Sequence, residues 1–151
     1  MNLVIDIGNT AVKFIIFDEQ GVCLHQCEST CGDIVPLKEL LEQTPVNRAI
    51  VSAVAEAEEP LSLYLKHMDP KPLWLTEHTR LPIRNAYGTP QTLGSDRLAA
   101  VVGARVDFPS RNVLVVDVGT CITYDLITAE GCYHGGNIAP GMRMRFQAMH
   151  E

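Results

Sequence analysis

Two acidic residues lie inside apolar stretches of the sequence, each two positions before a glycine. Asp6 interrupts LVIDIG at residues 3–8, and Asp117 interrupts LVVDVG at residues 114–119. An ionised carboxylate in an apolar strand is costly unless a metal ion, a basic side chain or protonation compensates it. The glycine that follows removes a Cβ and lets an anionic ligand approach the backbone amides, which favours the metal ion. Capping of the turn by the carboxylate is the alternative.

Residues beside the first carboxylate fit the same chemistry. Thr10 offers a hydroxyl, and Lys13 lies on the returning strand, where its ammonium can reach the same anion. Two such hairpins facing each other would form a cleft with a carboxylate on each wall, able to hold the phosphates and the metal of a nucleotide. One Asp-x-Gly alone occurs often by chance, so the hypothesis depends on the pair.

The elements that position these residues follow from hydrophobic periodicity and turn signals. Residues 3–8, 11–18 and 22–29 are predicted as strands joined by short turns, and residues 48–54 and 71–76 as further strands. Helices are predicted at 34–43, with Asp33 as N-cap, and at 60–68. Another helix is predicted after Ser95, its N-cap, with Asp96 in the first turn, and its small residues at 99, 100, 103 and 104 suit close packing. This alternation indicates an α/β architecture.

The opening pattern returns later in the chain. LVVDVGTCITYDLIT at 114–128 repeats LVIDIGNTAVKFIIF at 3–17 with an offset of 111, which places Thr120 over Asn9. A glycine-containing turn and a third strand follow each copy, and such self-similarity indicates a duplicated unit. We therefore expect mixed sheets flanked by helices in two domains, residues 1–110 and 111–151. The second domain is expected to be incomplete in this chain.

Composition excludes several classes of function. The 151 residues are 46% hydrophobic and 20% charged, with a net charge of −6, so we expect a packed core and no duplex nucleic acid as partner. No apolar run approaches about 18 residues, so no membrane span is predicted. The chain enters a strand at once with no signal peptide, which favours a cytoplasmic protein. Cys23, Cys27 and Cys31 lack the spacing of a zinc site and are expected to be reduced thiols.

Four segments together resemble one known family. DIGNTAVK (6–13), NAYGTPQTLGSDR (85–97), DVGTCITYD (117–125) and GGNIAPG (135–141) occur in the order typical of the type III pantothenate kinases. That family belongs to the actin/hexokinase/heat-shock-kinase superfamily, whose duplicated domains have a ribonuclease H-like fold and clamp ATP with Mg²⁺. Ser95 stands where the family usually has alanine, a small change for the loop.

The resemblance implies a role for each matching residue. The stretch from Asp6 to Lys13 would bind ATP, with Asp6 holding Mg²⁺ directly or through water, and Thr120 would also contact ATP. Tyr87 and the residues from Gly94 to Arg97 would bind pantothenate, with Arg97 facing its carboxylate and Asp96 as the general base. Asp117 would bind the potassium or ammonium ion that the family requires. The implied ATP-binding residues are Asp6, Ile7, Gly8, Asn9, Thr10, Ala11, Val12, Lys13 and Thr120, and the implied substrate-binding residues are Tyr87, Gly94, Ser95, Asp96 and Arg97.

The chemistry of phosphoryl transfer agrees with these roles, because the reaction needs positioning and charge neutralisation more than covalent help. The alternative for Asp96 and Arg97 is stabilisation of the helix start and a surface ion pair. Family members are homodimers, and Met142, Met144 and Met149 on the last predicted helix would suit a subunit contact. Two other functions stay open: a different actin-like phosphotransferase acting on a sugar, acetate or polyphosphate, and a non-catalytic regulator like the Bvg accessory factor. We expect these 151 residues alone to have weak activity or none.

Overall fold

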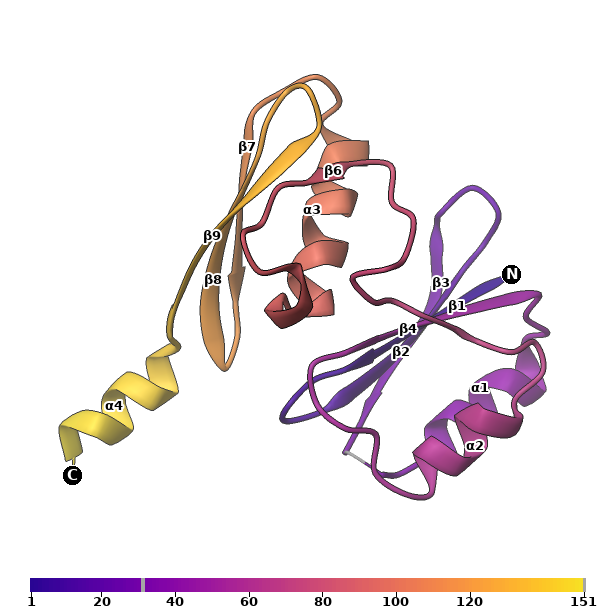
Figure 1. Ribbon diagram of the computed structural model, residues 1–151. Helices are drawn as coiled ribbons and strands as arrows, with labels where there is room; N and C mark the ends of the chain where they lie inside the picture. Colours follow the sequence, from indigo (N-terminus) through magenta and orange to yellow (C-terminus); the bar gives the residue numbers. More distant parts are fainter. Residues whose placement is uncertain (31, 151) are drawn as a thin grey trace. The chain divides into compact units, whose positions relative to one another are not determined.

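The computed structural model describes residues 1–30 and 32–150, which form two compact units (Figure 1). The first unit spans Met1–Thr79, and the second begins at Arg80. The sequence predicted a domain boundary after residue 110, whereas the compact units divide after Thr79. The difference arises because the helix at Ser95–Asp107 packs on the two strands that follow it. The boundary between the duplicated domains stays a prediction.

The first unit is a mixed sheet with two helices. In the sheet order β3-β2-β1-β4-β5, β1, β2 and β3 pair antiparallel, while β4 and β5 extend the sheet in parallel with β1. The predicted hairpins of residues 3–29 are therefore confirmed. Its elements are β1 (Asn2–Ile7), β2 (Val12–Phe17), β3 (Cys23–Ser29), α1 (Val35–Gln43), β4 (Arg48–Ala53), α2 (Leu61–His67) and β5 (Leu73–Trp74).

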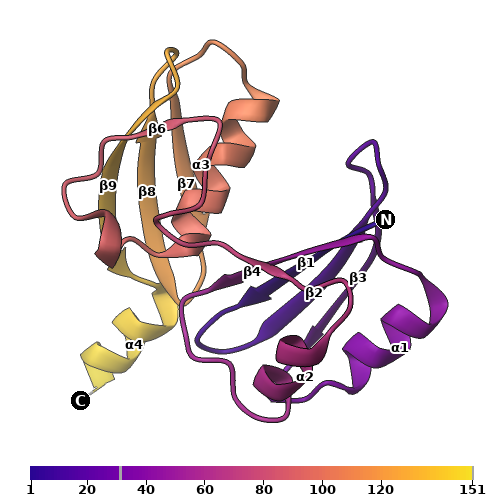
Figure 2. The same cartoon turned by 45° about the vertical axis from the view of Figure 1, so that its right-hand side comes forward.

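The core of this unit lies on one face of the sheet, under α1 and α2 (Figure 2). Alternation along β1 turns Leu3, Ile5 and Ile7 to this face, where each is at most 1% exposed. The helices contribute leucines at the spacing of one helical face, Leu37 with Leu40 and Leu61 with Leu65. Because the core occupies one face, Asp6 necessarily points to the other.

The start of α1 differs in detail from the prediction. Asp33 does hold the first turn, since its Oδ1 accepts a hydrogen bond from the N–H of Val35 at 2.9 Å. The N-cap position, however, is Ile34, one residue later than predicted, and Pro36 follows inside the first turn. Proline suits this place because the first amides of a helix have no partner within the helix. Cys31 lies outside the described residues.

The second unit contains another mixed sheet, in the order β6-β9-β8-β7, with α3 against β7 and β8. β7, β8 and β9 pair antiparallel, and β6 joins β9 in parallel. Its elements are β6 (Arg84–Asn85), the 3-10 helix η1 (Pro90–Thr92), α3 (Ser95–Asp107), β7 (Val113–Val118), β8 (Cys121–Ile127), β9 (Cys132–Pro140) and α4 (Met142–His150).

The N-cap predicted for α3 is wrong, and the packing predicted for its small residues holds only in part. The N-cap is Gly94, and Ser95 is the first helical residue and is buried. Of the small residues predicted to pack, Ala99 and Gly103 are exposed, whereas Ala100 and Ala104 are half-buried. The helix instead turns a different side to the sheet, composed of Ser95, Arg97, Leu98 and Val101.

Gly103 therefore offers a simple test of this orientation. A Cβ built on Gly103 would have no atom within 4 Å outside its own helix, so Gly103→Ala is expected to raise the free energy of unfolding by about 0.5–1 kcal/mol. Urea unfolding followed by circular dichroism measures the change. A loss of stability would mean that this side of α3 is packed after all.

The repeat predicted from the sequence is visible in the hydrogen-bonding register. Asp6 pairs with Lys13 in the first unit, and Asp117 pairs with Thr123 in the second. The offset of 111 holds only up to this turn. In the second copy this turn is one residue shorter, since Ile7 pairs with Val12 whereas Val118 pairs with Ile122. Thr10 therefore has no counterpart in the second copy.

The turn between the second and third strands has the same geometry in both copies. The register shifts between Ile16 and Phe17 in one sheet and between Leu126 and Ile127 in the other. Gly21 and Gly131 then adopt positive φ angles of 83° and 77°, and each donates its N–H to the residue three positions earlier, Asp18 or Thr128. A bulge and a turn shared at equivalent places support duplication more strongly than hydrophobic pattern alone.

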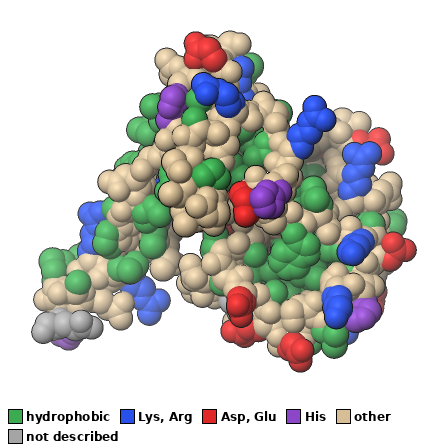
Figure 3. Space-filling model, in the orientation of Figure 1, with side chains coloured by type: hydrophobic (Ala, Val, Ile, Leu, Met, Phe, Trp, Pro, Cys, Tyr) green, Lys and Arg blue, Asp and Glu red, His purple; other side chains and the backbone are tan. Residues whose placement is uncertain are grey.

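Burial is where the two copies differ. Leu114, Val116 and Val118 on β7 correspond to the buried Leu3, Ile5 and Ile7, yet they are 60%, 47% and 66% exposed. We call this set, with Leu126 on β8, the uncovered face. Hydrophobic side chains on this side of the second unit and on α4 are visible in Figure 3. Among the described residues, β7 is also the last strand of its sheet, whereas β1 pairs with β4 on the corresponding edge.

Candidate functional site

In the first unit the predicted phosphate site lies at the carboxyl end of β1. Asp6 is half-buried and pairs across the sheet with Lys13 on β2 and with Ser52 on the parallel strand β4. Directly opposed residues point to the same face, so the carboxylate and the ammonium share the side of the sheet opposite α1 and α2. Ligands of α/β sheets commonly bind beyond the carboxyl ends of strands, which is where this pair lies.

The turn after Asp6 accounts for part of the motif. The Gly8 N–H donates to the Ala11 carbonyl at 3.0 Å, and a Cβ on Gly8 would lie 3.2 Å from that same oxygen. A side chain at this position would thus crowd the turn, and the Gly8 amide is engaged there. Asn9 and Thr10 are exposed at the tip. The side chains of Ile7 and Val12 are buried in the core, so these two residues can offer a nucleotide only their backbone groups.

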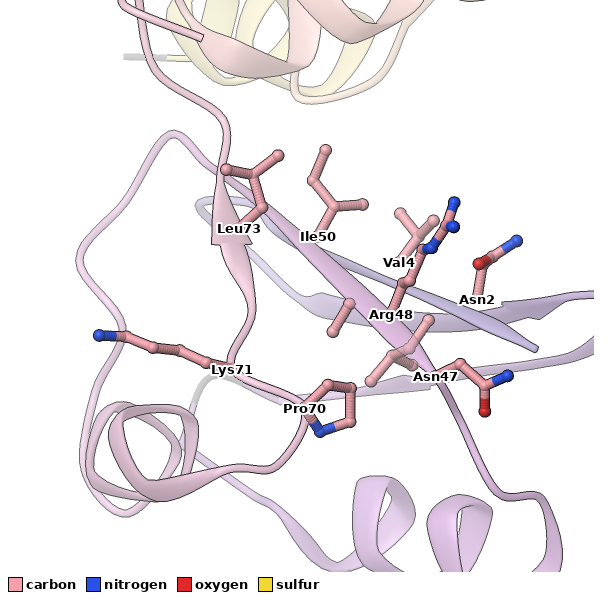
Figure 4. A pocket seen from close by; sticks show the side chains of 10 residues that line it. Asn2, Val4, Asn47, Arg48, Ile50, Pro70, Lys71 and Leu73 are labelled. Carbon is pink, nitrogen blue, oxygen red and sulfur yellow. The ribbon is translucent and has the colours of Figure 1, made fainter.

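A pocket of about 480 Å³ in this unit lies elsewhere (Figure 4). It is lined by residues at the amino ends of β1, β4 and β5, including Asn2, Arg48 and Leu73. Asp6 and Gly8 belong to the opposite end of β1. The pocket is therefore separate from the predicted phosphate site, and we assign it no part in the chemistry.

In the second unit the matching turn joins β7 to β8. Asp117 is exposed near the end of β7, and Thr120 at the tip accepts a hydrogen bond on its carbonyl from the Gly141 N–H at 3.0 Å. A Cβ on Gly141 would lie 2.9 Å from the Thr120 carbonyl carbon, so only glycine allows this approach. The segment that leads into α4 is thereby tied to the turn beside Asp117.

The implied metal ions can be compared with these residues. Mg²⁺ is commonly held by one or two carboxylates together with substrate phosphates and water, so a single half-buried Asp6 beside an exposed turn fits a nucleotide-bound Mg²⁺. Asp117 offers an exposed carboxylate, a type of oxygen ligand that suits a hard monovalent cation. Among residues 1–30 and 32–150, no three His, Cys, Asp or Glu side chains cluster as a metal site made by protein alone would require.

The most ordered polar cluster of the second unit joins α3 to the sheet. Arg97 in the first turn of α3 turns its guanidinium to Asp125 on β8, and the side chains are only 6% and 1% exposed. Nε of Arg97 donates to both carboxylate oxygens at 3.1 Å, and Nη2 donates to Oδ1 at 2.6 Å. The hydrogen bonding to Asp125 is the main reason why the pKa of Arg97 lies above its usual value. Arg97 therefore stays charged in this buried position.

Two tyrosines complete this cluster. The Tyr133 hydroxyl donates to Asp125 Oδ1 at 2.7 Å, and its ring stacks on Tyr87 with centroids 6.2 Å apart and an interplanar angle of 10°. The Arg97 guanidinium lies over the Tyr87 ring, 5.6 Å from its centroid. The pKa of Tyr133 is raised mainly by burial, and in addition by the hydrogen bond to Asp125 and the charge of Asp125. The Tyr133 hydroxyl therefore remains a donor.

The structure thus brings together some of the predicted substrate-binding residues. Tyr87 and Arg97 are in contact, and Asp96 follows Ser95 in the same first turn of α3, half-buried. Asp96 Oδ1 accepts the Arg97 N–H at 2.7 Å, which leaves its other oxygen for a second interaction. Gly94 begins this turn, and its carbonyl accepts the Leu98 N–H at 3.3 Å. The ATP-binding residues of the first unit and the cleft between the duplicated hairpins stay predictions.

Sequence reasoning missed Asp125 and Tyr133. The signal for Asp125 was available, because it is a carboxylate inside an apolar strand, the same observation that singled out Asp6 and Asp117. Asp125 lies in the motif DVGTCITYD but precedes no glycine, so the Asp-x-Gly pattern did not include it. Tyr133 offered no comparable signal, since a tyrosine in a strand is ordinary.

Comparison with known proteins decides the family. The model of the family described as "Type III pantothenate kinase" matches residues 2–151, almost the whole chain. This chain belongs to the type III pantothenate kinase family. A relative of that name from Bacteroides fragilis is 44% identical over 151 residues, and one from Phocaeicola vulgatus is 45% identical. These alignments cover 100% and 99% of this chain but 62% of each relative, so the chain spans less than two thirds of their length.

A solved structure supports the fold of this type III pantothenate kinase chain. A protein from Sinorhizobium meliloti, described as a candidate 2-dehydro-3-deoxygalactonokinase, superposes with a TM-score of 0.51 at 16% identity. The superposition covers 91% of this chain and 54% of that protein. The predicted actin-like α/β fold, with mixed sheets flanked by helices, is confirmed. In the part of the chain that the structure describes, no helix has the length and apolarity to cross a membrane.

Proposed function

We propose that the intact protein transfers the γ-phosphoryl group of ATP to the primary hydroxyl of pantothenate, the opening step of coenzyme A synthesis. The observation that carries this proposal is the assembly of Tyr87, Asp96 and Arg97 at the start of α3, in a chain that matches the type III pantothenate kinase family throughout. The relatives that share 44–45% identity carry the same name.

The reaction assigns a task to each side chain. A bond forms between the pantothenate hydroxyl oxygen and the γ-phosphorus, the bond from that phosphorus to the β,γ-bridging oxygen breaks, and ADP departs. The hydroxyl proton goes to the Asp96 carboxylate, which need not be a strong base because the proton becomes acidic only as the bond forms. Tyr87 and Arg97 orient the acceptor, and Arg97 provides the charge that a substrate carboxylate needs.

The nucleotide would bind at the β1–β2 turn. The exposed residues Asn9 and Thr10 and the ammonium of Lys13 would contact its phosphates, and Thr120 of the β7–β8 turn would also contact ATP. When bound, Mg²⁺ held through Asp6 would neutralise phosphate charge, and a potassium or ammonium ion held through Asp117 would supply further positive charge. We also propose a cytoplasmic homodimer, for which the exposed Met142, Met144 and Met149 of α4 are candidate contacts.

The proposal is tested by assaying the full-length protein with ATP, Mg²⁺ and pantothenate, in potassium and in sodium buffers. We expect 4′-phosphopantothenate and ADP in equal amounts and a higher rate in potassium. Turnover of a sugar or of acetate without pantothenate would favour another actin-like phosphotransferase. Binding of ATP or pantothenate without any product would favour a regulatory protein.

The role of Lys13 can be tested separately. Lys13→Met should raise the KM for ATP about tenfold, because a hydrogen bond between charged groups contributes about 1.5 kcal/mol or more. Steady-state kinetics at saturating pantothenate provide the measurement. Lys71→Met is the matched control, since Lys71 is an exposed lysine of the same unit that lines the separate pocket. Equal effects of the two substitutions would place the nucleotide elsewhere.

A further inference from the structure

We propose that Asp125, supported by Tyr133, is a positioning residue that holds Arg97 and Tyr87 in the geometry needed to bind the substrate carboxylate. This inference rests on the proposed function, because it concerns the same pocket. It adds residues that lie outside the predicted site and that contact the substrate only through others.

The first argument is the orientation of the guanidinium. Asp125 engages Nε and Nη2, which form one edge of the Arg97 fork. The guanidinium has another edge, formed by Nη1 and the second N–H of Nη2. This edge presents two donors in the same geometry and suits a second carboxylate. An arginine clamped along one edge presents the other in a fixed direction, which reduces the rotamer entropy lost when a ligand binds.

The second argument is energetic. Two opposite charges as buried as Arg97 and Asp125 lose their hydration, and such a pair often contributes little net stability compared with apolar residues of similar size. Asp125 nevertheless receives four hydrogen bonds from Arg97 and Tyr133 on its two oxygens. A carboxylate bonded this completely fixes the orientation of its partners, and orientation is what a specific binding site needs.

The third argument concerns Tyr87. The segment that carries it is held to β9 by hydrogen bonds from the Arg84 N–H to the Gly131 carbonyl at 2.9 Å and from the Ala86 N–H to the Tyr133 carbonyl at 2.8 Å. Its ring then lies between Arg97 and Tyr133, stacked on the latter. Gly135 makes this possible, since a Cβ there would lie 2.8 Å from Cε2 of Tyr87. Asp125, Tyr133 and Gly135 together therefore define where Tyr87 and Arg97 stand.

The test uses the full-length protein and two variants of different severity. Asp125→Asn removes the charge that Arg97 binds, and Tyr133→Phe removes one hydrogen bond to Asp125 while keeping the ring stack. Each variant is assayed with pantothenate and with pantothenol, in which an alcohol replaces the carboxylate. Tyr124→Phe is the matched control, because Tyr124 also lies on β8 but points to the other face of the sheet than Asp125.

We expect Asp125→Asn to raise the KM for pantothenate about tenfold or more, with kcat and the KM for ATP within about twofold of the wild type. Tyr133→Phe should raise the same KM about threefold, corresponding to the loss of one hydrogen bond. The preference for pantothenate over pantothenol should shrink in both variants. Tyr124→Phe should change none of these quantities.

Other outcomes would overturn the inference. An unchanged KM for pantothenate in Tyr133→Phe, or a parallel loss of kcat and of ATP binding, would reduce this cluster to a structural ion pair. If Asp125→Asn does not fold, Tyr133→Phe alone decides. A wild-type enzyme that does not phosphorylate pantothenate would refute the proposed function and this inference with it. An active wild type whose variants keep the wild-type KM for pantothenate would refute the inference alone.

Discussion

Replacing Asp96 by asparagine is expected to lower kcat of the full-length enzyme by about 100- to 10,000-fold, the usual contribution of a general base. The substitution keeps the shape of the side chain and its Oδ1, which accepts the Arg97 N–H at 2.7 Å at the start of α3. The first turn of the helix, and with it Arg97, should therefore stay in place. Only the capacity to accept the hydroxyl proton is lost.

Rapid-quench kinetics with pantothenate and ATP measure the chemical step, and calorimetry measures binding of pantothenate to the same variant. Binding within about threefold of the wild type is expected, since Asp96 acts on the transition state. The control is Asp107→Asn, which makes the same change at the last residue of α3, where the side chain is exposed. Full turnover in Asp96→Asn would remove Asp96 from the mechanism. If the variant loses both pantothenate binding and turnover, Asp96 is a structural residue.

Gly136→Ala is expected to lower the free energy of unfolding by roughly 3 kcal/mol, near the upper end for overpacking. A Cβ at this position would lie 2.6 Å from the Tyr124 carbonyl carbon and 3.0 Å from Asp125 Cα. Both are backbone atoms of β8, so no side-chain rotation relieves the overlap, and the two strands must separate. Because Gly136 pairs with Asp125, the separation also disturbs the carboxylate that holds Arg97.

The measurement is the urea midpoint of the unfolding transition, compared with that of the wild type. Gly103→Ala is the matched control, since the same methyl group enters open space there and should stabilise the chain. A midpoint for Gly136→Ala within the error of the wild type would show that β8 and β9 are farther apart than in the structure.

Local patterns predicted the first three strands well, because the first two are short apolar runs and all three are separated by turns with their own signals. They failed where a residue's environment comes from distant parts of the chain. Arg97 is buried although it is charged, since its partner Asp125 lies 28 residues away, and this contact decides which side of α3 faces the sheet. Small residues at 99 and 103 then remain outside, contrary to the prediction from composition.

The ends of strands were also predicted less well than their positions. Residues 71–76 were predicted as a strand, but β5 is confined to Leu73–Trp74. Pro72 has no N–H to give to a ladder, which accounts for the late start. The sequence could single out the residues of the candidate site because they share short motifs, whereas the contacts of Asp125 with Arg97 and of Tyr133 with Tyr87 join segments that are distant in the sequence.

The outer edge of β7 has a consequence for the behaviour of this chain in solution. Soluble proteins usually shield a terminal strand with charges, prolines or a covering segment. β7 carries valines and a leucine with one acidic residue, Asp117, and three of these apolar side chains belong to the uncovered face. In the described part of the chain, unpaired backbone groups therefore coincide with exposed apolar surface. This combination is typical of aggregation-prone segments, and crowding by other copies should aggravate it.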